Sequence, residues 1–135
     1  MPLQTTRRAC LIVLPALLPA WASASPAWQR AMQRARALRD EAVRDGDQPY
    51  GAVLLREDRI VGEAPSRVIT AADPTAHAEM EAIRDASRRL RSGDLSGCVL
   101  VSTSRPCPMC EAAAAAARVS RMVYGDSLTD GGAPS

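Results

Sequence analysis

Short apolar runs alternate along this chain with longer segments in which apolar residues recur every three or four positions, and this alternation constrains the fold most strongly. The recurring segments predict three helices, over residues 28–42, 76–91 and 107–118. The short runs predict four strands, over residues 50–55, 60–64, 98–103 and 121–124, of which the first two form a hairpin. Strands separated by helices favour a partly parallel sheet with helices on its faces.

We therefore expect an α/β fold, a three-layer α/β/α sandwich around a mixed sheet of about four to five strands. In this sheet the hairpin pair alone is expected to be antiparallel. Two apolar stripes should face the sheet: Trp28, Met32, Ala35, Leu38 and Ala42 on the first helix, and Met80, Ile83, Ala86 and Leu90 on the second.

The N-terminal segment, residues 1–24, has the pattern of a signal peptide. The pair Arg7-Arg8 precedes an apolar run over residues 10–18, and Ala22-Ser23-Ala24 is a small-residue cleavage pattern. The apolar run is too short to cross a bilayer as a stable helix, so we expect no membrane anchor once the signal is removed. Cleavage would leave one domain over residues 25–135.

The segment from Thr6 to Leu11 also resembles a twin-arginine signal, whose carriers are commonly exported already folded. Two arginines before an apolar run occur in ordinary secretory signals as well, so both export routes stay open. Either route predicts a periplasmic or secreted protein, and an unused signal predicts a cytoplasmic one. Export after folding would let a metal ion enter before the cysteines met oxidants.

The charge balance argues against a nucleic-acid partner. Without Arg7 and Arg8, the 15 remaining arginines equal the 15 acidic residues, and the chain has no lysine. Proteins that bind phosphate backbones usually carry a basic excess, because neutralising phosphates supplies much of their affinity. The chain also lacks asparagine, so no function of this protein can depend on an Asn side chain.

One histidine and a pair of cysteines carry the chemistry. Cys107 and Cys110 open a predicted helix three positions apart, so both sulfurs lie on one side of its first turn, where free N–H groups stabilise thiolates. His77, the single histidine, also lies at a predicted helix start. Two helix starts side by side could present one nitrogen and two sulfurs to a tetrahedral zinc ion, and the open fourth position is typical of a catalytic site. Glu79 is close enough to accept a proton from a water in that position.

The motif His77-Ala78-Glu79, followed by Pro106-Cys107-Pro108-Met109-Cys110, resembles the signature of the zinc-dependent cytidine deaminase-like superfamily. The longer phrases from Asp73 to Glu79 and from Pro49 to Val53 resemble the branch that contains guanine deaminases and tRNA adenosine deaminases. The resemblance runs from residue 28 to Gly125 and agrees with the predicted order of helices and strands.

The resemblance implies hydrolytic deamination of a nucleobase or nucleoside, in which zinc-bound hydroxide attacks a ring carbon that carries an amine and ammonia leaves. It implies a single zinc ion in each chain, with His77, Cys107 and Cys110 as ligands and Glu79 as the proton shuttle. Guanine, converted to xanthine, is the substrate expected first, and a tRNA adenosine deaminase-like activity is the alternative. The family also leads us to expect a homodimer.

Three departures from the family pattern bear on substrate and activity. Relatives usually have Asn near the end of the second strand to hold the base, whereas this chain offers Ser66, whose hydroxyl makes fewer directed hydrogen bonds than a carboxamide. Arg105 stands where the branch commonly has Glu. The sequence also stops at Ser135, so we expect a C-terminally short domain whose pocket is open or is closed by a neighbouring subunit.

Two other interpretations stay open. Cys107 and Cys110 could form a redox pair, although such a pair needs no His-Ala-Glu motif upstream. The domain could also bind zinc after losing catalysis through the departures above, although a purely structural site has no need of Glu79. Cys98 stands alone on a predicted strand and is expected to be a small buried apolar residue.

Overall fold

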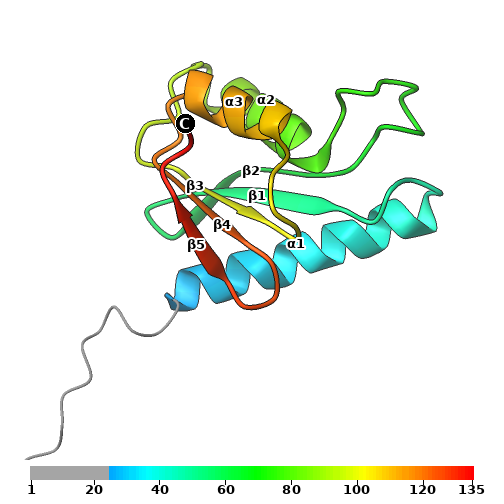
Figure 1. Ribbon diagram of the computed structural model, residues 1–135, viewed down its shortest axis with the longest axis horizontal. Helices are drawn as coiled ribbons and strands as arrows, with labels where there is room; N and C mark the ends of the chain where they lie inside the picture. Colours follow the sequence, from blue (N-terminus) through cyan, green and yellow to red (C-terminus); the bar gives the residue numbers. More distant parts are fainter. Residues whose placement is uncertain (1–24) are drawn as a thin grey trace, which may run out of the picture.

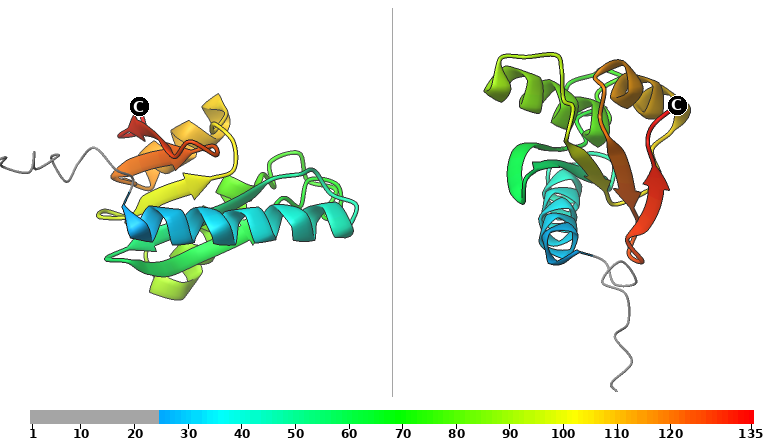
Figure 2. Two further views of the ribbon diagram at one scale, coloured as in Figure 1. Left: turned by 90° about the horizontal axis from the view of Figure 1, so that it is seen from below. Right: turned by 90° about the vertical axis from the view of Figure 1, so that its left-hand side faces the viewer.

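The structure, a computed structural model, describes residues 25–135, and in this part of the chain a five-stranded mixed sheet separates one helix from two others (Figure 1). Helix α1 (Pro26–Arg44) covers one face of the sheet, and helices α2 (Ala78–Leu90) and α3 (Pro108–Ala116) lie over the other (Figure 2). The strands are β1 (Gly51–Arg56), β2 (Arg59–Pro65), β3 (Val99–Ser102), β4 (Arg121–Tyr124) and β5 (Thr129–Gly132). The predicted three-layer α/β/α sandwich is confirmed. The predicted signal segment lies outside the described residues.

The strand order is β2-β1-β3-β4-β5, so β3 lies at the centre of the sheet. Strand β1 pairs antiparallel with both β2 and β3, β3 pairs parallel with β4, and β4 pairs antiparallel with β5. The prediction that the hairpin alone is antiparallel is therefore wrong. The chain leaves β2, the second strand of the hairpin, passes through α2, and returns to the sheet as β3 on the other side of β1. Strand β3 consequently runs parallel to β2 and opposite to the strand between them.

Strand β5 has no counterpart among the individually predicted strands. Its residues, Thr129-Asp130-Gly131-Gly132, show no apolar alternation and are mostly exposed. An ion pair between Arg121 and Asp130 joins β5 to β4. Because β5 covers the edge of β4, that strand is protected from pairing with another chain.

Helix α1 begins at a capped, proline-led start. The hydroxyl of Ser25 accepts a 3.3 Å hydrogen bond from the backbone N–H of Ala27, and Pro26 occupies the first turn. The predicted stripe is buried except for Trp28, which is half-buried, and Ala27 and Ala31 join it. Neither α1 nor any other helix of residues 25–135 is long and apolar enough to span a bilayer.

Helix α2 packs on β2 through small side chains. Its buried residues are Ala78, Glu79, Ala82, Ile83 and Ala86. Of the predicted stripe, Ile83 and Ala86 are buried, whereas Met80 and Leu90 are only half-buried. The close approach depends on Gly62 of β2, because a Cβ at that position would lie 2.5 Å from the Cβ of Ala86. Short side chains on both elements thus bring α2 close to the sheet.

The two faces of the sheet have separate cores, as the pleat of the strands requires. Val53, Val101 and Val123 face α1, whereas Leu54, Leu100 and Met122 face α2 and α3. Cys98 is fully buried in the core under α2 and α3, as predicted.

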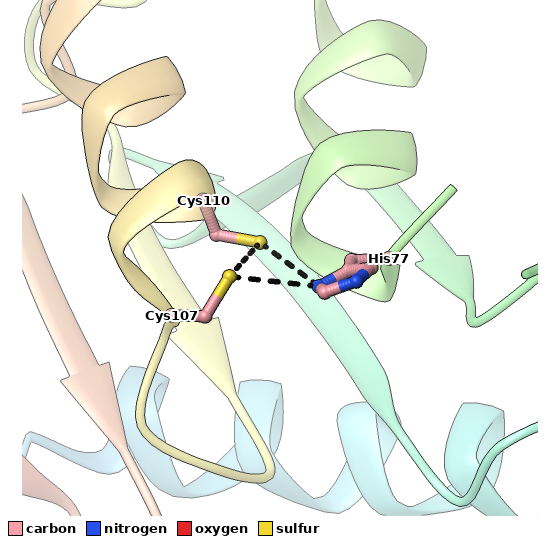
Figure 3. Close-up of side chains that lie close together, drawn as sticks. All are labelled: His77, Cys107 and Cys110. Carbon is pink, nitrogen blue, oxygen red and sulfur yellow. Dashed lines mark hydrogen bonds between the residues drawn. The ribbon is translucent and has the colours of Figure 1, made fainter. Parts of the chain in front are cut away.

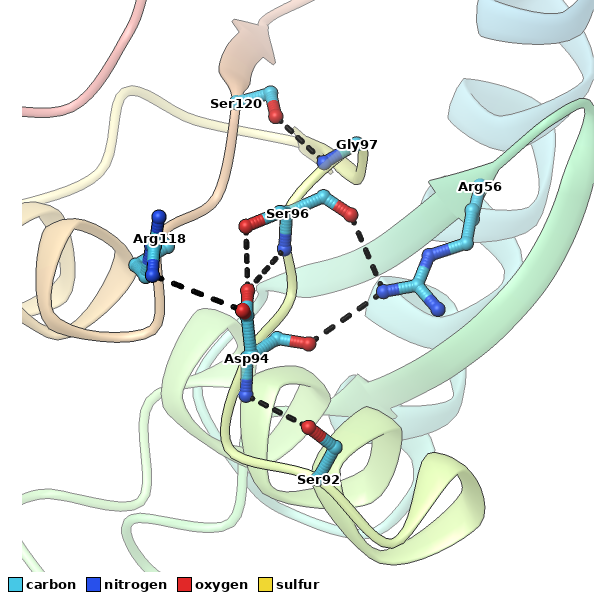
Figure 4. A network of polar contacts seen from close by, with 7 residues as sticks. All are labelled: Arg56, Ser92, Asp94, Ser96, Gly97, Arg118 and Ser120. Carbon is cyan, nitrogen blue, oxygen red and sulfur yellow. Dashed lines mark hydrogen bonds and ion pairs between the residues drawn. The ribbon is translucent and has the colours of Figure 1, made fainter.

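The connection from α2 to β3 is held by a polar network around Asp94 (Figure 4). The Asp94 carboxylate accepts hydrogen bonds from the backbone N–H (2.9 Å) and the hydroxyl of Ser96. The Arg56 guanidinium donates to the carbonyl oxygen of Ser96 (3.2 Å), and the N–H of Gly97 donates to the hydroxyl of Ser120 (2.7 Å). These contacts fix the point at which β3 enters the sheet.

Candidate functional site

The starts of α2 and α3 present three side chains to one another (Figure 3). His77 is the N-cap residue of α2 and Cys107 is the N-cap residue of α3, and both have extended backbone. Neither side chain makes a capping hydrogen bond, so the imidazole and the thiol are free for another role. Cys110 follows in the first turn of α3, and its sulfur points toward the His77 ring. The structure thus brings together the predicted nitrogen and sulfur ligands.

The distances between these atoms fit a zinc ion. Nδ1 of His77 lies 3.6 Å from Sγ of Cys107 and 3.5 Å from Sγ of Cys110, and the two sulfurs are 3.6 Å apart. Zinc binds thiolate at about 2.3 Å and imidazole at about 2.0–2.1 Å, so tetrahedral ligands lie about 3.5–3.8 Å from one another. The three atoms form one face of such a tetrahedron, and they are the group in residues 25–135 that could hold a metal ion.

The electrostatics of the cluster also favour a cation. Cys110 is fully buried, whereas Cys107 and His77 are half-buried. Burial raises the pKa of the Cys110 thiol, and the nearby Glu79 carboxylate raises it further. A thiolate at this position is therefore costly unless a positive charge lies beside it. A divalent ion bound by both cysteines would supply that charge, which would couple metal binding to folding.

Glu79 lies between the cluster and the sheet. The side chain is in the first turn of α2 and is 4% exposed. Its Oε1 accepts a 2.6 Å hydrogen bond from the hydroxyl of Ser102, and its Oε2 lies 3.7 Å from Sγ of Cys110. One carboxylate oxygen is thus held by the sheet, while the other borders the ligand cluster. An oxygen in this place can exchange a proton with a molecule on the open side of the cluster.

A pocket of about 290 Å³ opens beside the cluster. Its lining consists of Gln48, Tyr50, His77, Glu79, Ser104, Arg105 and Cys107. This volume is at the lower end of the range for small-molecule sites. Arg105 is the cation of this lining, it is exposed, and its side chain makes no hydrogen bond or ion pair with any described residue. A positive charge therefore stands free at the pocket.

Ser66 is not part of this pocket lining. Its side chain is 2% exposed, and its hydroxyl donates a 2.9 Å hydrogen bond to Oδ1 of Asp47. The hydroxyl is thus engaged with a buried carboxylate rather than directed at the ligand cluster. This placement lends no support to the predicted contact between Ser66 and the substrate.

Asp47 gathers hydrogen bonds from both loops that border the pocket. Its carboxylate accepts from the backbone N–H groups of Gln48, Ile69 and Thr70, and from the Thr70 hydroxyl, at 2.8–3.1 Å. Burial acts to raise the pKa of Asp47, but these hydrogen bonds outweigh it and hold the pKa well below the usual value. The carboxylate therefore stays ionised and fixes the loops.

Four residues of the site were not among the predicted site residues. Gln48, Tyr50 and Ser104 line the pocket, and the hydroxyl of Ser102 donates a hydrogen bond to the Glu79 carboxylate. The alternation of β3 contains a signal for Ser102, because this polar residue falls on the same core-facing side as Leu100. Nothing comparable in the sequence singles out Gln48 or Ser104.

The comparison with protein families gives a match over residues 26–126 to the model of the cytidine and deoxycytidylate deaminase zinc-binding region. This range contains the three residues of the ligand cluster, Glu79, and every residue that lines the pocket.

Two curated relatives differ in the substrates that their names give. The tRNA-specific adenosine deaminase of Aquifex aeolicus is 41% identical over 90 residues, which are 65% of this chain and 60% of that protein. The guanine deaminase of Bacillus subtilis is 40% identical over 100 residues, which are 73% of this chain and 64% of that protein. A solved structure of guanine deaminase from Bacillus subtilis matches with a TM-score of 0.69 at 39% identity, over 72% of this chain and 62% of that one. The chain thus spans less than two thirds of the length of each of these proteins.

Proposed function

Because the chain belongs to the cytidine and deoxycytidylate deaminase family of zinc-binding proteins, we propose that it is a hydrolase that deaminates a nucleobase or nucleoside. The observation that carries the proposal is the position of Glu79, whose Oε2 borders the ligand cluster while its side chain lines the pocket. A zinc ion that serves only the fold needs no buried carboxylate beside it. The arrangement is therefore better suited to catalysis than to structural support.

The proposed reaction replaces an exocyclic amine by oxygen. A C–O bond forms between water and the ring carbon, the C–N bond breaks, and ammonia leaves. When bound, zinc supplies a nucleophile at neutral pH, because it lowers the pKa of a coordinated water. His77, Cys107 and Cys110 would hold the ion, and two thiolates would balance its charge.

Glu79 moves the protons in this scheme. Its Oε2 takes a proton from the attacking water and delivers it to the ring nitrogen next to the reacting carbon, which removes the ring's double bond to that carbon. It then passes the second proton of the water to the departing amine, so that ammonia leaves as a neutral molecule. The burial of Glu79 keeps bulk water from competing for these protons.

Other residues of the lining orient the substrate. The Tyr50 ring is 40% exposed at the pocket and offers an aromatic surface on which a base can stack. The Gln48 carboxamide provides both a donor and an acceptor, and the Ser104 hydroxyl can serve as either. In this chain, which has no asparagine, Gln48 takes the part of the carboxamide that holds the base.

We favour a small substrate, with guanine first. The pocket volume of about 290 Å³ suits a base or nucleoside. The balanced charge of the chain after Arg8 offers no basic excess for an RNA backbone. A tRNA adenosine deaminase-like activity is the second candidate, because the Aquifex aeolicus relative of that name is 41% identical.

The test is ammonia release by the zinc-loaded protein. Guanine, adenine, cytosine, their nucleosides and a tRNA anticodon stem-loop are offered in parallel, and Glu79→Gln provides the control. Release from guanine that the control abolishes supports the proposal, whereas release from the stem-loop alone favours the second candidate. If a folded, zinc-loaded protein releases nothing from any of them, the domain is a zinc-binding protein without deaminase activity.

Export of the protein is also proposed. Ser25, the first residue after the predicted cleavage position, already caps α1, so cleavage after Ala24 leaves the described fold with its cap intact. Cell fractionation followed by N-terminal sequencing tests this, with Ser25 expected as the first residue. The homodimer stays a prediction, which light scattering at micromolar concentration tests.

A further inference from the structure

We propose that Ser102 is a positioning residue for catalysis, which fixes the Glu79 carboxylate through Oε1 and leaves Oε2 for proton transfer. The inference rests on the proposed deaminase function and adds to it a residue that lies outside both the ligand cluster and the pocket lining. Ser102 acts through Glu79, because its hydroxyl lies 2.6 Å from Oε1.

The backbone of Ser102 is held on both sides. It is the last residue of the central strand β3, where it pairs with Ala52 of β1 and Tyr124 of β4. Its carbonyl oxygen also accepts a 3.0 Å hydrogen bond from the N–H of Gly125. Because the backbone of Ser102 is held in place, the position of its hydroxyl varies little. The hydroxyl is therefore suited to orient another side chain that must be placed accurately.

The burial of Ser102 shows that its hydroxyl depends on Glu79. Ser102 is 0% exposed, on the same face of β3 as the core residue Leu100. A buried hydroxyl without a partner costs free energy, and the partner that the structure gives this hydroxyl is the Glu79 carboxylate. An apolar residue would fill this core position without such a requirement.

The hydrogen bond from Ser102 gives the two oxygens of the Glu79 carboxylate different roles. Ser102 donates to Oε1 from the sheet, which fixes the plane of the carboxylate, and Oε2 then lies beside Sγ of Cys110. Without the hydroxyl, packing and the 3.7 Å contact between Oε2 and Sγ of Cys110 would be left to oppose rotation about the last side-chain bond of Glu79, because that torsion is intrinsically broad. Proton transfer depends on correct geometry, so a rotated carboxylate reacts less often.

The first test compares Ser102→Ala with Ser102→Thr in the full-length, zinc-loaded protein. Ser87→Ala is the matched control, because it removes a hydroxyl from α2, the helix that carries Glu79, at a half-buried position away from the pocket. We expect Ser102→Ala to lower kcat by about 10- to 100-fold, as is typical for residues that orient groups at a metal site. KM and bound zinc should not change, Ser102→Thr should restore most of kcat, and Ser87→Ala should match the wild type.

An equal loss in Ser102→Ala and Ser102→Thr would overturn the proposal, because it would show that packing rather than the hydroxyl matters. A wild-type kcat in Ser102→Ala would overturn it as well. If the wild-type protein binds zinc and turns over no substrate, the proposed function itself fails, and the positioning role fails with it. The two failures are therefore distinguishable.

The second test needs no substrate. Melting temperatures of Ser102→Ala, Glu79→Ala and the double variant form a cycle that isolates the interaction between the two side chains. We expect Ser102→Ala to lower Tm in the wild-type background, and to leave Tm unchanged or raise it in the Glu79→Ala background, where the buried hydroxyl has already lost its acceptor. The same decrease in both backgrounds would show that Ser102 and Glu79 are not coupled.

Discussion

The hydroxyl of Ser66 donates a 2.9 Å hydrogen bond to Oδ1 of Asp47, which joins the loop after β2 to the loop before β1. The loop after β2 continues to His77 and is closed by a 2.9 Å hydrogen bond from the N–H of Arg67 to the carbonyl oxygen of Ala76. The loop before β1 carries Gln48 into the pocket. The contact therefore connects the segment that leads to His77 with the segment that places Gln48 in the pocket lining.

Replacing the carboxylate in this network should loosen both loops. Asp47→Ala leaves several backbone N–H groups and two hydroxyls without their acceptor, so we expect the free energy of unfolding to fall by about 2–3 kcal/mol at pH 7. Urea denaturation followed by circular dichroism measures the change. A loss below the error of that measurement would mean that water replaces the carboxylate at no cost.

The same carboxylate predicts a pH dependence of stability. The pKa of Asp47 is lower in the folded state than the value of about 3.9 in an unfolded chain, so its contribution is complete above that value. As pH falls below about 4, the contribution is lost progressively toward the folded-state pKa. The stability difference between the wild type and Asp47→Asn should therefore be constant from pH 5 to 7 and should shrink below pH 4. A difference that grew on acidification would contradict this assignment.

Ser66→Ala separates a structural role of the hydroxyl from a substrate contact. Because the hydroxyl donates to Asp47, its removal should lower the free energy of unfolding by about 1 kcal/mol. We expect kcat and KM to stay close to the wild-type values, since Ser66 does not line the pocket. A large rise in KM at unchanged stability would instead restore the role that the sequence predicts for this residue.

Gly62 tests the close packing of α2 on the sheet. A Cβ at this position would lie 2.5 Å from the Cβ of Ala86 and 2.6 Å from the carbonyl oxygen of Ala82, so the helix would have to move. We expect Gly62→Ala to destabilise the protein by about 2–3 kcal/mol. Gly93→Ala is the matched control, because a Cβ there meets no atom within 4 Å, and its effect should be about 0.5 kcal/mol or less. Thermal or urea unfolding of the two variants provides the comparison.

Metal removal tests the ligand cluster directly. In Cys107→Ala one vertex of the cluster is lost, so we expect bound zinc to fall from one ion per chain to almost none, with a Tm that no longer responds to a chelator. The wild-type Tm should drop on chelation, because buried thiols lose the cation that compensates them. Cys98→Ala is the control, since this buried residue lies outside the cluster and should leave zinc content unchanged. Atomic absorption and differential scanning calorimetry measure both quantities.

The parts of the fold that depend on local periodicity could be predicted from the sequence, and the parts that depend on pairing could not. Alternation of apolar runs and helical repeats is a local signal, and it correctly located α1, α2, α3 and the strands β1 to β4. The antiparallel pairing of β1 with β3 depends on which strand of the hairpin β3 lies beside, and β5 consists of polar and glycine residues whose strand conformation comes from pairing with β4.

The candidate site divides in the same way. His77, Cys107, Cys110 and Glu79 are chemically distinctive and close in sequence to helix starts, so their grouping could be predicted. The partners of Glu79 and Asp47 could not, because Ser102 is 23 positions from Glu79 and Ser66 is 19 positions from Asp47. Serine hydroxyls bond many kinds of neighbour, and only the folded arrangement decides which one.

Arg105 should select the charge of the substrate. It lines the pocket, is exposed, and has no ion-pair partner in residues 25–135, so its charge is available to an incoming molecule.

For a ligand that carries an anionic group, such as a nucleoside monophosphate, reversing the charge in Arg105→Glu removes one attraction and adds one repulsion. An exposed charge pair contributes about 0.2–1 kcal/mol, so losing the attraction and gaining a repulsion of similar size amounts to about 0.4–2 kcal/mol. The value of kcat/KM for the monophosphate relative to the nucleoside should therefore fall by about 2- to 30-fold. The free energy of unfolding and the zinc content should not change, because the guanidinium forms no hydrogen bond or ion pair with another described residue. Steady-state kinetics on the matched substrate pair measures the ratio, and the effect should weaken as ionic strength rises. A ratio that is the same in Arg105→Glu and the wild type would show that Arg105 does not sense substrate charge.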